Sequence, residues 1–372
     1  MIKSIILNIL RTIRYVMYRF IKNFYFTNFK CISNVRLISF DLKESFFGYY
    51  NLSPENNVGE KLICAPDAQE NHIYVIEEEN TYRHVGSSKA WNWQQGSMLQ
   101  WSPNNKNIIY YNSYNQLEKK YNTSIVDIAK NHLVKTLSKP ICCVSQDESY
   151  TLSLNFERLT LMRPDYGYFC NKEINLPDNE NDGIWKINLK TNQEELIITL
   201  KQLIDLSPVE TMVDAEHKVN HIDIAPNGKR FMFLHRWVGP KGRFMRLITA
   251  NKDGKDLFIL NGDKMISHSC WLDNDRIISF CYTEQFGNAY IVFVDKTNEF
   301  KMLSDNLPKC DGHPSVDPSG RWMVTDTYPK FDRMSRLYLY NFHTDEVICL
   351  GRLYQPLKYS GSYRIDLHPK WN

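Results

Sequence analysis

The sequence lacks the marks of several specialised protein classes. Its 372 residues carry 45 lysines and arginines against 42 aspartates and glutamates, and a net charge of only +3 excludes a chain whose whole surface binds nucleic acid. The nine cysteines form no CxxC motif, so the sequence offers neither a zinc motif nor a disulfide framework. Their scattered placement favours a reducing compartment, the cytoplasm.

Acidic residues are missing from the first 40 positions, whereas residues 1–30 carry six lysines and arginines. Apolar residues between Ile2 and Phe24 recur at helical spacing, which predicts a basic amphipathic helix over residues 1–33. Basic residues interrupt each apolar run before it reaches the length of about 18 residues that a membrane span needs. We therefore expect this helix either to pack on the domain or to lie on the inner face of a membrane.

Aromatic residues, by contrast, are abundant, at 13% of the chain, with 22 tyrosines and 8 tryptophans. Their flat apolar faces and polar edges suit sugar binding, but β-strands are also enriched in them for packing alone. Hydrophobic residues at 43% and charged residues at 23% are ordinary for a globular protein, so the chain can bury a sizeable core.

A short pattern of strand, turn and second strand recurs along the chain from about Ser45. Its seven copies begin at Tyr49, Met98, Ile141, His221, His268, His313 and His368. Five of the six steps between copies span 43 to 55 residues, and the step that ends at His221 spans 80 residues. The clearest copies contain Pro-Asn-Gly or Pro-Ser-Gly turns, as in HIDIAPNGKRFMFLH and HPSVDPSGRWMVTD.

This period is typical of β-propeller blades and WD40-like repeats, which contain four strands in about 40 to 50 residues. We therefore predict an all-β protein, a seven-bladed β-propeller over residues 34–372. The long step is interpreted as a third blade with an insert at about residues 156–183. Because the copy at His368 stops within its first strand, we expect the last blade to be truncated, with residues 34–41 able to add a strand to it.

Histidine begins four consecutive copies of the pattern: His221, His268, His313 and His368. The inner strands of a propeller line its channel, so equivalent residues at their starts lie around one rim. Converging neutral imidazoles suit a divalent transition metal. A packing histidine inherited by duplicated blades would produce the same spacing. Asp311 and Asp366, each two residues before a histidine, would then be further ligands or would orient the imidazoles.

The second strand of each unit returns to the same rim, and the insert begins there as well. The residues that reach the rim are polar and aromatic, and arginine among them is suited to bidentate recognition of carboxylates. The candidates for the site are Arg158, Arg163, Tyr166, Arg236, Trp237, Arg243 and Tyr328.

Five segments resemble the seven-bladed propellers of the oligogalacturonate lyase family, and the similarity covers most of residues 45–372. The segments are WNWQQGSMLQWSPNN, HKVNHIDIAPNGKRFMFLHRW, SHSCWLDNDRIISF, DGHPSVDPSGRWMVTDTYP and YRIDLHPKW. That family cleaves uronic-acid glycosides by β-elimination and holds a manganese-like ion on histidines and a glutamine. The resemblance implies a divalent metal held by His268, His313 and His368.

The same resemblance implies a base and an arginine beside the metal. His221, or His217 four residues earlier, is then the base, with Tyr166 as a further candidate, and Gln95 and Gln100 are the candidates for the glutamine. Arg236 and Arg163 would neutralise the uronate carboxylate. Arg158, Arg243, Tyr328 and Trp237 would bind the rest of the substrate.

Two functions remain open at this point. The first is a lyase that acts on uronic-acid-containing oligosaccharides. The second is a non-catalytic propeller that binds acidic glycans or proteins at the membrane surface, because close relatives resemble chains found among bacterial surface-polysaccharide assembly enzymes, some of them labelled glycosyltransferases. The residues do not support transferase chemistry directly, since the closest acidic pair, Asp273 and Asp275, lies in a repeat turn where aspartate is common.

Overall fold

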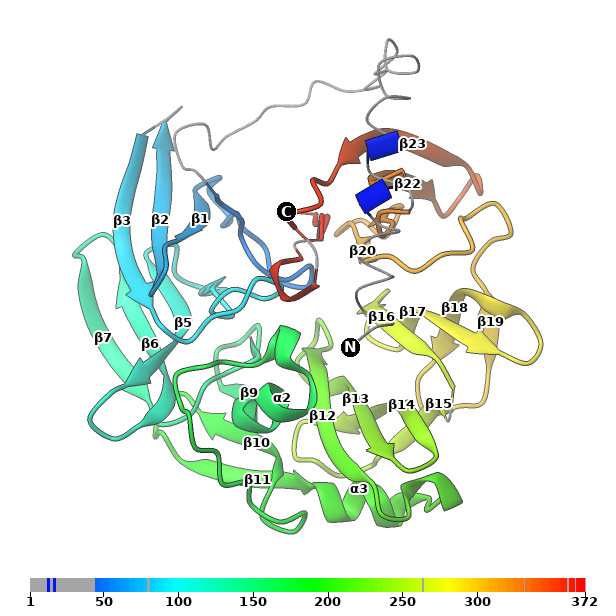
Figure 1. Cartoon of the computed structure of the whole chain (residues 1–372), viewed down its shortest axis with the longest axis horizontal. Helices are drawn as coiled ribbons and strands as arrows, with labels where there is room; N and C mark the ends of the chain where they lie inside the picture. Colours follow the sequence, from blue (N-terminus) through cyan, green and yellow to red (C-terminus); the bar gives the residue numbers. More distant parts are fainter. Residues whose placement is uncertain are drawn as a thin grey trace.

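The computed structural model is a ring of antiparallel β-sheets around a central channel (Figure 1). It describes residues 12–13, 16–17, 44–78, 81–262, 264–330, 332–359, 361–364 and 366–371. Each sheet consists of strands that follow one another in the sequence, as expected for propeller blades. The all-β propeller prediction is therefore confirmed.

The first three blades hold the strands up to residue 199. Blade 1 contains β1 (Lys61–Pro66), β2 (Asn71–Glu78) and β3 (Thr81–Ser88). Blade 2 contains β4 (Gln100–Trp101), β5 (Ile108–Asn115), β6 (Lys120–Asp127) and β7 (His132–Leu137). Blade 3 contains β8 (Cys143–Val144), β9 (Tyr150–Leu154), β10 (Gly183–Asn188) and β11 (Glu194–Thr199).

The other three blades follow the same order. Blade 4 contains β12 (Glu216–Ile224), β13 (Arg230–Gly239), β14 (Gly242–Asn251) and β15 (Phe258–Gly262). Blade 5 contains β16 (Ile266–Trp271), β17 (Arg276–Thr283), β18 (Gly287–Val294) and β19 (Phe300–Met302). Blade 6 contains β20 (Ser315–Val316), β21 (Trp322–Asp326), β22 (Met334–Asn341) and β23 (Val347–Tyr354).

The described residues form six blades, so the predicted count of seven is wrong. The seventh copy of the pattern holds only a first-strand segment, and residues 366–371 form no strand. This segment lies between blade 1 and blade 6 (Figure 1). His368 Nδ1 is 2.9 Å from the Gly48 carbonyl oxygen, and the Trp371 amide donates to Ser315 Oγ at 3.3 Å. One segment therefore spans the place where a seventh sheet was expected.

Apolar side chains fill the space between neighbouring blades. In β13 every residue from Arg230 to Trp237 is buried, because both faces of this strand are covered by other strands. One cluster joins Met232 and Leu234 of blade 4 to Ile277 and Ile291 of blade 5. The recurring strand-to-strand turn of the pattern forms as predicted at Gly228, whose amide donates to the Ala225 carbonyl oxygen at 2.8 Å.

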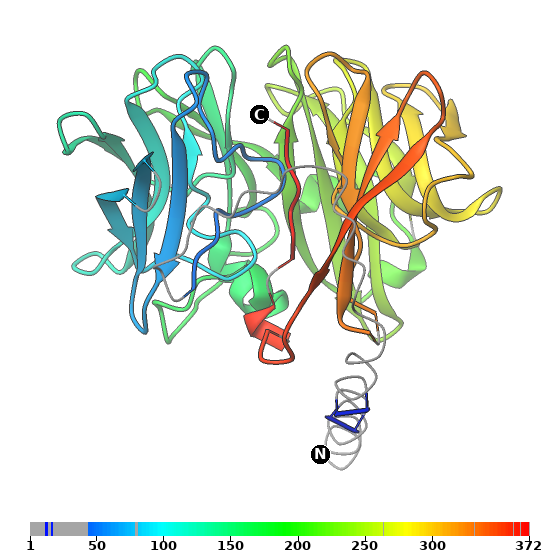
Figure 2. The same ribbon diagram turned by 90° about the horizontal axis from the view of Figure 1, so that it is seen from above.

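The helical segments lie between strands and after the last blade. The chain between β9 and β10 contains α2 (Phe156–Met162) and η1 (Pro164–Tyr166), and Asn155 caps α2. The segment between β11 and β12 contains α3 (Leu200–Leu206) and η2 (Glu210–Met212). A short turn of helix, η3 (Gly361–Tyr363), precedes residues 366–371. Figure 2 shows α2 and η3 at the same end of the ring.

The predicted helix over residues 1–33 lies almost entirely outside the described residues. Residues 12–13 and 16–17 are described, and they are helical and exposed. Membrane-surface binding through residues 1–30 therefore stays a prediction. Among the described residues, no helix has the length and apolar character that a membrane crossing requires.

A buried ion pair between blades 4 and 5 should contribute strongly to stability. Arg230 Nε donates to Asp295 at 2.5 Å, and the Thr249 hydroxyl donates to the same carboxylate at 2.6 Å. Removing one partner of a buried pair typically costs about 3–5 kcal/mol, because the other charge stays buried. Arg230 keeps its pair with Asp256 at 2.7 Å in Asp295→Ala, so we expect this variant to lower the free energy of unfolding in urea by about 3 kcal/mol, the lower end of that range.

The matched control is Glu284→Ala, which removes an exposed ion pair with Lys264 of 3.1 Å. Exposed pairs contribute about 0–1 kcal/mol, so this variant should unfold almost like the unchanged protein. Equal losses in the two variants would show that the interblade pair does not carry the stability assigned to it.

Candidate functional site

The four histidines of the repeat meet at one rim of the channel. The ring centroids of His221 and His268 are 6.0 Å apart, those of His268 and His313 are 4.0 Å apart, and those of His313 and His368 are 4.4 Å apart. His221 lies on β12, His268 on β16, His313 just before β20 and His368 in the C-terminal segment. Residues up to 147 positions apart in the chain thus form one arc of imidazoles.

The backbone at these positions departs from regular strand geometry. Pairing of β12 shifts register between Asn220 and Asp223, and pairing of β16 shifts between Ile266 and Ser269. His221 and His368 have φ values of 53° and 48°, in the left-handed region that non-glycine residues rarely occupy. Bulges of this kind re-aim a side chain and are frequent beside functional sites.

Each of three imidazoles is oriented through Nδ1. His313 Nδ1 is 2.8 Å from Asp326 Oδ1, a buried carboxylate at the end of β21. His368 Nδ1 lies 2.9 Å from the Gly48 carbonyl oxygen, which only accepts, so this nitrogen donates. His268 Nδ1 lies 3.1 Å from Asp311 Oδ1. Histidines that bind metals are typically held in this way, with the other ring nitrogen free to coordinate.

Three polar atoms at the centre of the arc are buried and have no hydrogen-bond partner within the described part of the chain. They are His313 Nε2, His368 Nε2 and Asp366 Oδ1. One ligand atom from each of these residues lies within 4.8 Å of those of the other two. Because an unsatisfied buried polar group is costly, and imidazole and carboxylate are metal ligands, these residues fit a divalent cation.

Most of the imidazoles are neutral near pH 7. Burial, together with the neighbouring His313, lowers the pKa of His268 to about 4. Burial also holds the pKa values of His221 and His368 well below the usual range. Burial would lower the pKa of His313 too, but the Asp326 carboxylate outweighs it and raises that pKa. Neutral imidazoles have the lone pair that metal binding requires.

Two tyrosines that the sequence interpretation missed pack against the arc. Tyr49 stacks on His221 with centroids 5.3 Å apart, and its hydroxyl is 2.7 Å from His221 Nδ1. Tyr50 lies 5.2 Å from His313 between ring centroids, and its hydroxyl donates to the Ser269 carbonyl oxygen at 2.7 Å. The sequence did contain a signal for Tyr49, because this residue begins the first copy of the pattern and so occupies the position that histidine holds in four later copies.

A basic group flanks the arc on the side of His221. Arg236 is buried, and its Nε has no partner among the described residues. The Arg163 guanidinium lies 4.9 Å from the centroid of the Tyr166 ring, and that ring meets His221 edge-on at 5.3 Å. Lys218 was not among the residues predicted from the sequence. It lies opposite Arg236 on the neighbouring strand, and its Nζ donates to the Met162 carbonyl oxygen at 3.1 Å.

The charges in this group repel one another. Burial lowers the pKa of Lys218 to about 7, and Arg236, Arg163 and the exposed Arg243 add to the shift. Burial, together with Arg163, also lowers the pKa of Arg236 to about 10. A local excess of positive charge that depresses its own protonation favours an anionic ligand.

Tyr328 and Arg364 border the other side of the arc. The Tyr328 ring lies 5.5 Å from that of His313, and its hydroxyl is 3.5 Å from His268 Nε2. The Arg364 guanidinium lies 4.9 Å from the centroid of the Tyr328 ring and pairs with Asp366 at 3.1 Å. The pair with Arg364 uses Oδ2 of Asp366, and Oδ1 has no hydrogen-bond partner among the described residues.

Three predicted site residues make their contacts away from the arc: His217 and Trp237 lie on strands of blade 4, and Arg158 lies on α2 of the insert. His217 Nδ1 is 3.0 Å from His235 Nε2, and its ring stacks on Trp237. Trp237 is fully buried and donates to the Thr211 hydroxyl at 3.1 Å. Arg158 pairs with Asp182 at 2.6 Å at the base of the insert. In this structure all three side chains are engaged in packing.

The two glutamine candidates occupy different surroundings. Gln100 donates to the Met98 carbonyl oxygen at 3.1 Å and accepts from the Val144 amide at 3.1 Å, both away from the arc. Gln95 borders a small cavity that Tyr49 and His221 also line. Asp366 forms a group of close ligand atoms with His313 and His368.

Comparisons with known proteins support the fold. No protein-family model matches the sequence, and no curated protein does. A solved oligogalacturonate lyase from Vibrio parahaemolyticus has 14% identity and a TM-score of 0.58, over 88% of this chain and 84% of that one. A structure of oligogalacturonate lyase in complex with manganese has 15% identity and a TM-score of 0.57, over 87% of this chain and 81% of that one. This chain therefore shares a propeller fold with these lyases.

Proposed function

We propose that the protein is a metal-assisted lyase that cleaves uronic-acid-containing oligosaccharides by β-elimination. The observation that carries the proposal is the group of unpartnered, buried ligand atoms of His313, His368 and Asp366 beside a cluster of positive side chains. An ordinary packing histidine would have both ring nitrogens satisfied or exposed. The likeness to lyases, one of them in complex with manganese, is consistent with this chemistry.

The residues that would hold the cation are His313, His368 and Asp366, with His268 next to them. A divalent cation bound there would act as a Lewis acid on the uronate carboxylate and make the C5 proton more acidic. Asp326 would keep the His313 ring in the orientation that turns Nε2 to the centre. The Gly48 carbonyl oxygen would do the same for His368.

Arg236 and Arg163 would bind the substrate carboxylate and neutralise its charge. His221 would remove the C5 proton through Nε2, with its Nδ1–H donating to the Tyr49 hydroxyl oxygen. The electron pair of the C5–H bond forms the C4–C5 double bond, and the C4–O bond to the leaving sugar breaks. Water would supply the proton to the departing oxygen. Positioned proton transfer of this kind typically contributes about 10²–10⁴-fold in rate.

The proposal is tested by incubating the manganese-loaded protein with oligogalacturonides and following the ultraviolet absorbance of the unsaturated product. We expect activity, and we expect His221→Ala to reduce kcat by about 10²–10⁴-fold. The exposed His132 on β7 provides the control, since His132→Ala should retain full activity.

A lack of product from every uronate oligosaccharide tested would overturn the lyase. Binding of the same oligosaccharides without cleavage would instead favour the non-catalytic glycan-binding module. Normal activity in His221→Ala would leave the lyase standing and remove His221 as its base.

Asp326 should set the affinity of the metal. Replacing the carboxylate that holds a ligating histidine typically lowers metal affinity about 10- to 100-fold. We expect this loss for Asp326→Asn, measured by titration with Mn²⁺, because the amide can still accept from the His313 backbone amide but no longer stabilises the imidazole as strongly. Unchanged affinity, with the fold intact by circular dichroism, would argue against metal binding through His313.

Binding of an acidic oligosaccharide should be accompanied by proton uptake. A carboxylate beside Lys218 offsets the repulsion from the arginines and raises the pKa of Lys218 from about 7. At a pH slightly above that value, part of the Lys218 population is neutral and takes up protons when the ligand binds. Calorimetry in buffers of different ionisation enthalpy should show uptake of a fraction of one proton, and Lys218→Met should abolish it. Identical uptake in Lys218→Met would place the anion elsewhere.

A further inference from the structure

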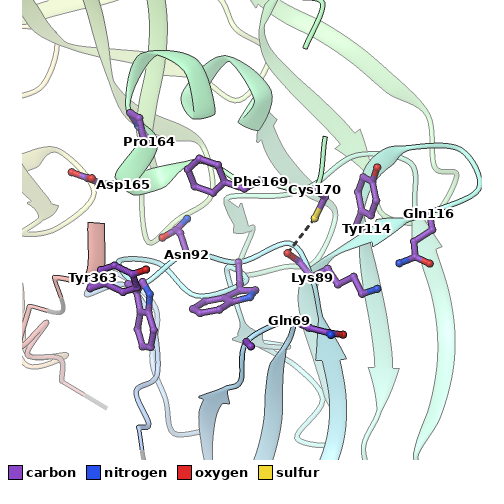
Figure 3. A pocket seen from close by; sticks show the side chains of 13 residues that line it. Gln69, Lys89, Asn92, Tyr114, Gln116, Pro164, Asp165, Phe169, Cys170 and Tyr363 are labelled. Carbon is purple, nitrogen blue, oxygen red and sulfur yellow. Dashed lines mark hydrogen bonds between the residues drawn. The ribbon is translucent and has the colours of Figure 1, made fainter. Parts of the chain in front are cut away.

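A second cavity lies beside the histidine arc, on the same end of the ring. Its volume is about 620 Å³, within the range of about 300–1,000 Å³ that is usual for ligand sites. Loops that follow β1, β3 and β5 line it on one side, and the insert and Tyr363 of η3 line it on the other (Figure 3).

Aromatic side chains face this cavity in several orientations. Trp91 and Trp93 meet edge-on with centroids 5.1 Å apart, and Tyr363 lies 6.3 Å from Trp93. The side chains of Phe169 and Tyr363 are 63% and 61% exposed, whereas large aromatic rings are usually buried in the core. Clustered exposed apolar side chains on a soluble domain commonly mark a binding site. Figure 3 shows Phe169 and Tyr363 pointing into the same space.

The polar groups of the cavity are mainly amides. Asn92 is 6% exposed, and its Oδ1 accepts from the backbone amides of Gln94 and Gln95 at 3.1 and 2.8 Å. Its Nδ2 is buried without a hydrogen-bond partner in the part of the chain that the structure describes. A buried donor of this kind at a cavity wall is satisfied when a ligand supplies an acceptor.

The cavity carries little net charge. Its charged lining residues are Lys89 and Asp165, and Lys89 Nζ lies 3.9 Å from Glu70 Oε1. The basic cluster of Lys218 and Arg236 lies at the histidine arc instead. The carboxylate of a uronic acid would therefore find no group of positive side chains here like the one at the arc. The aromatic rings of the cavity match the CH faces of an uncharged sugar, and its amide groups match the hydroxyl groups.

Two short segments connect this cavity to the histidine arc. Asp165 lines the cavity, and the next residue, Tyr166, contacts His221. Tyr363 lines the cavity, and the next residue, Arg364, contacts Tyr328. A linear ligand bound at the arc therefore has a neighbouring site within reach.

We propose that this cavity binds uncharged sugar residues of the same oligosaccharide whose uronate lies at the histidine arc. The link to cleavage rests on the proposed lyase, while sugar binding by the cavity does not. The protein then prefers oligosaccharides in which uronic acids and neutral sugars occur in one chain over chains of uronic acid alone.

The test compares two probes of equal length, an oligosaccharide of alternating rhamnose and galacturonic acid and an oligogalacturonide. Tryptophan fluorescence reports binding, because Trp91 and Trp93 line the cavity. We expect tighter binding of the mixed probe, and we expect Phe169→Ala and Tyr363→Ala each to weaken it about three- to tenfold, as the loss of one aromatic contact does. Leu117→Ala is the control, since Leu117 is 97% exposed beside Gln116 and does not line the cavity.

Measurements on His313→Ala separate this inference from the lyase. If this variant binds the mixed probe and loses binding when Phe169 is also replaced, the cavity is a sugar site whether or not the protein cleaves. If the protein cleaves uronates while Phe169→Ala and Tyr363→Ala bind both probes like the unchanged protein, the inference is wrong and the lyase stands. Absence of binding by the mixed probe overturns the inference as well.

Discussion

The hydrogen bond between His368 Nδ1 and the Gly48 carbonyl oxygen is the contact on which the site depends. Its 2.9 Å length joins residues 320 positions apart and links the C-terminal segment to blade 1. The Trp371 amide links the same segment to blade 6. The Tyr49 ring meets His368 edge-on at 5.1 Å and adds to the same junction. The hydrogen bond from His368 therefore both joins the C-terminal segment to the start of the propeller and orients a candidate metal ligand.

Burial explains why the residues of the arc fit a divalent cation. His268, His313, both tyrosine rings and Asp366 are buried at this rim, while His221 and His368 are partly buried. Burial lowers the pKa of His268 to about 4, so its imidazole is neutral and keeps a lone pair for coordination. His313 Nε2, His368 Nε2 and Asp366 Oδ1 then remain without partners in the described structure. A divalent cation would satisfy all three atoms together. The positive side chains around Lys218 would favour an anionic ligand next to them.

The repeat made the architecture and the histidine arc accessible from the sequence, because turn residues recur at a constant spacing and equivalent positions in a propeller share one rim. The number of blades was overestimated since the pattern counts inner strands, and the copy at His368 has no further strands. The carboxylates that hydrogen-bond to each histidine were harder to infer. Asp311 was expected beside His313 on a regular strand, but both residues precede β20, and Asp311 binds His268 while Asp326 binds His313.

The alternation of side chains along a regular strand also does not predict which residues of β12 reach the arc. The bulge between Asn220 and Asp223 changes the face of the sheet that each residue occupies. His217, placed four residues before His221, consequently packs in the blade against His235.

The most direct measurement is anomalous diffraction at the manganese edge from crystals grown with Mn²⁺. The account predicts one peak within coordination distance of His313, His368 and an oxygen of Asp366. A peak elsewhere, or no peak with these side chains ordered, would contradict it.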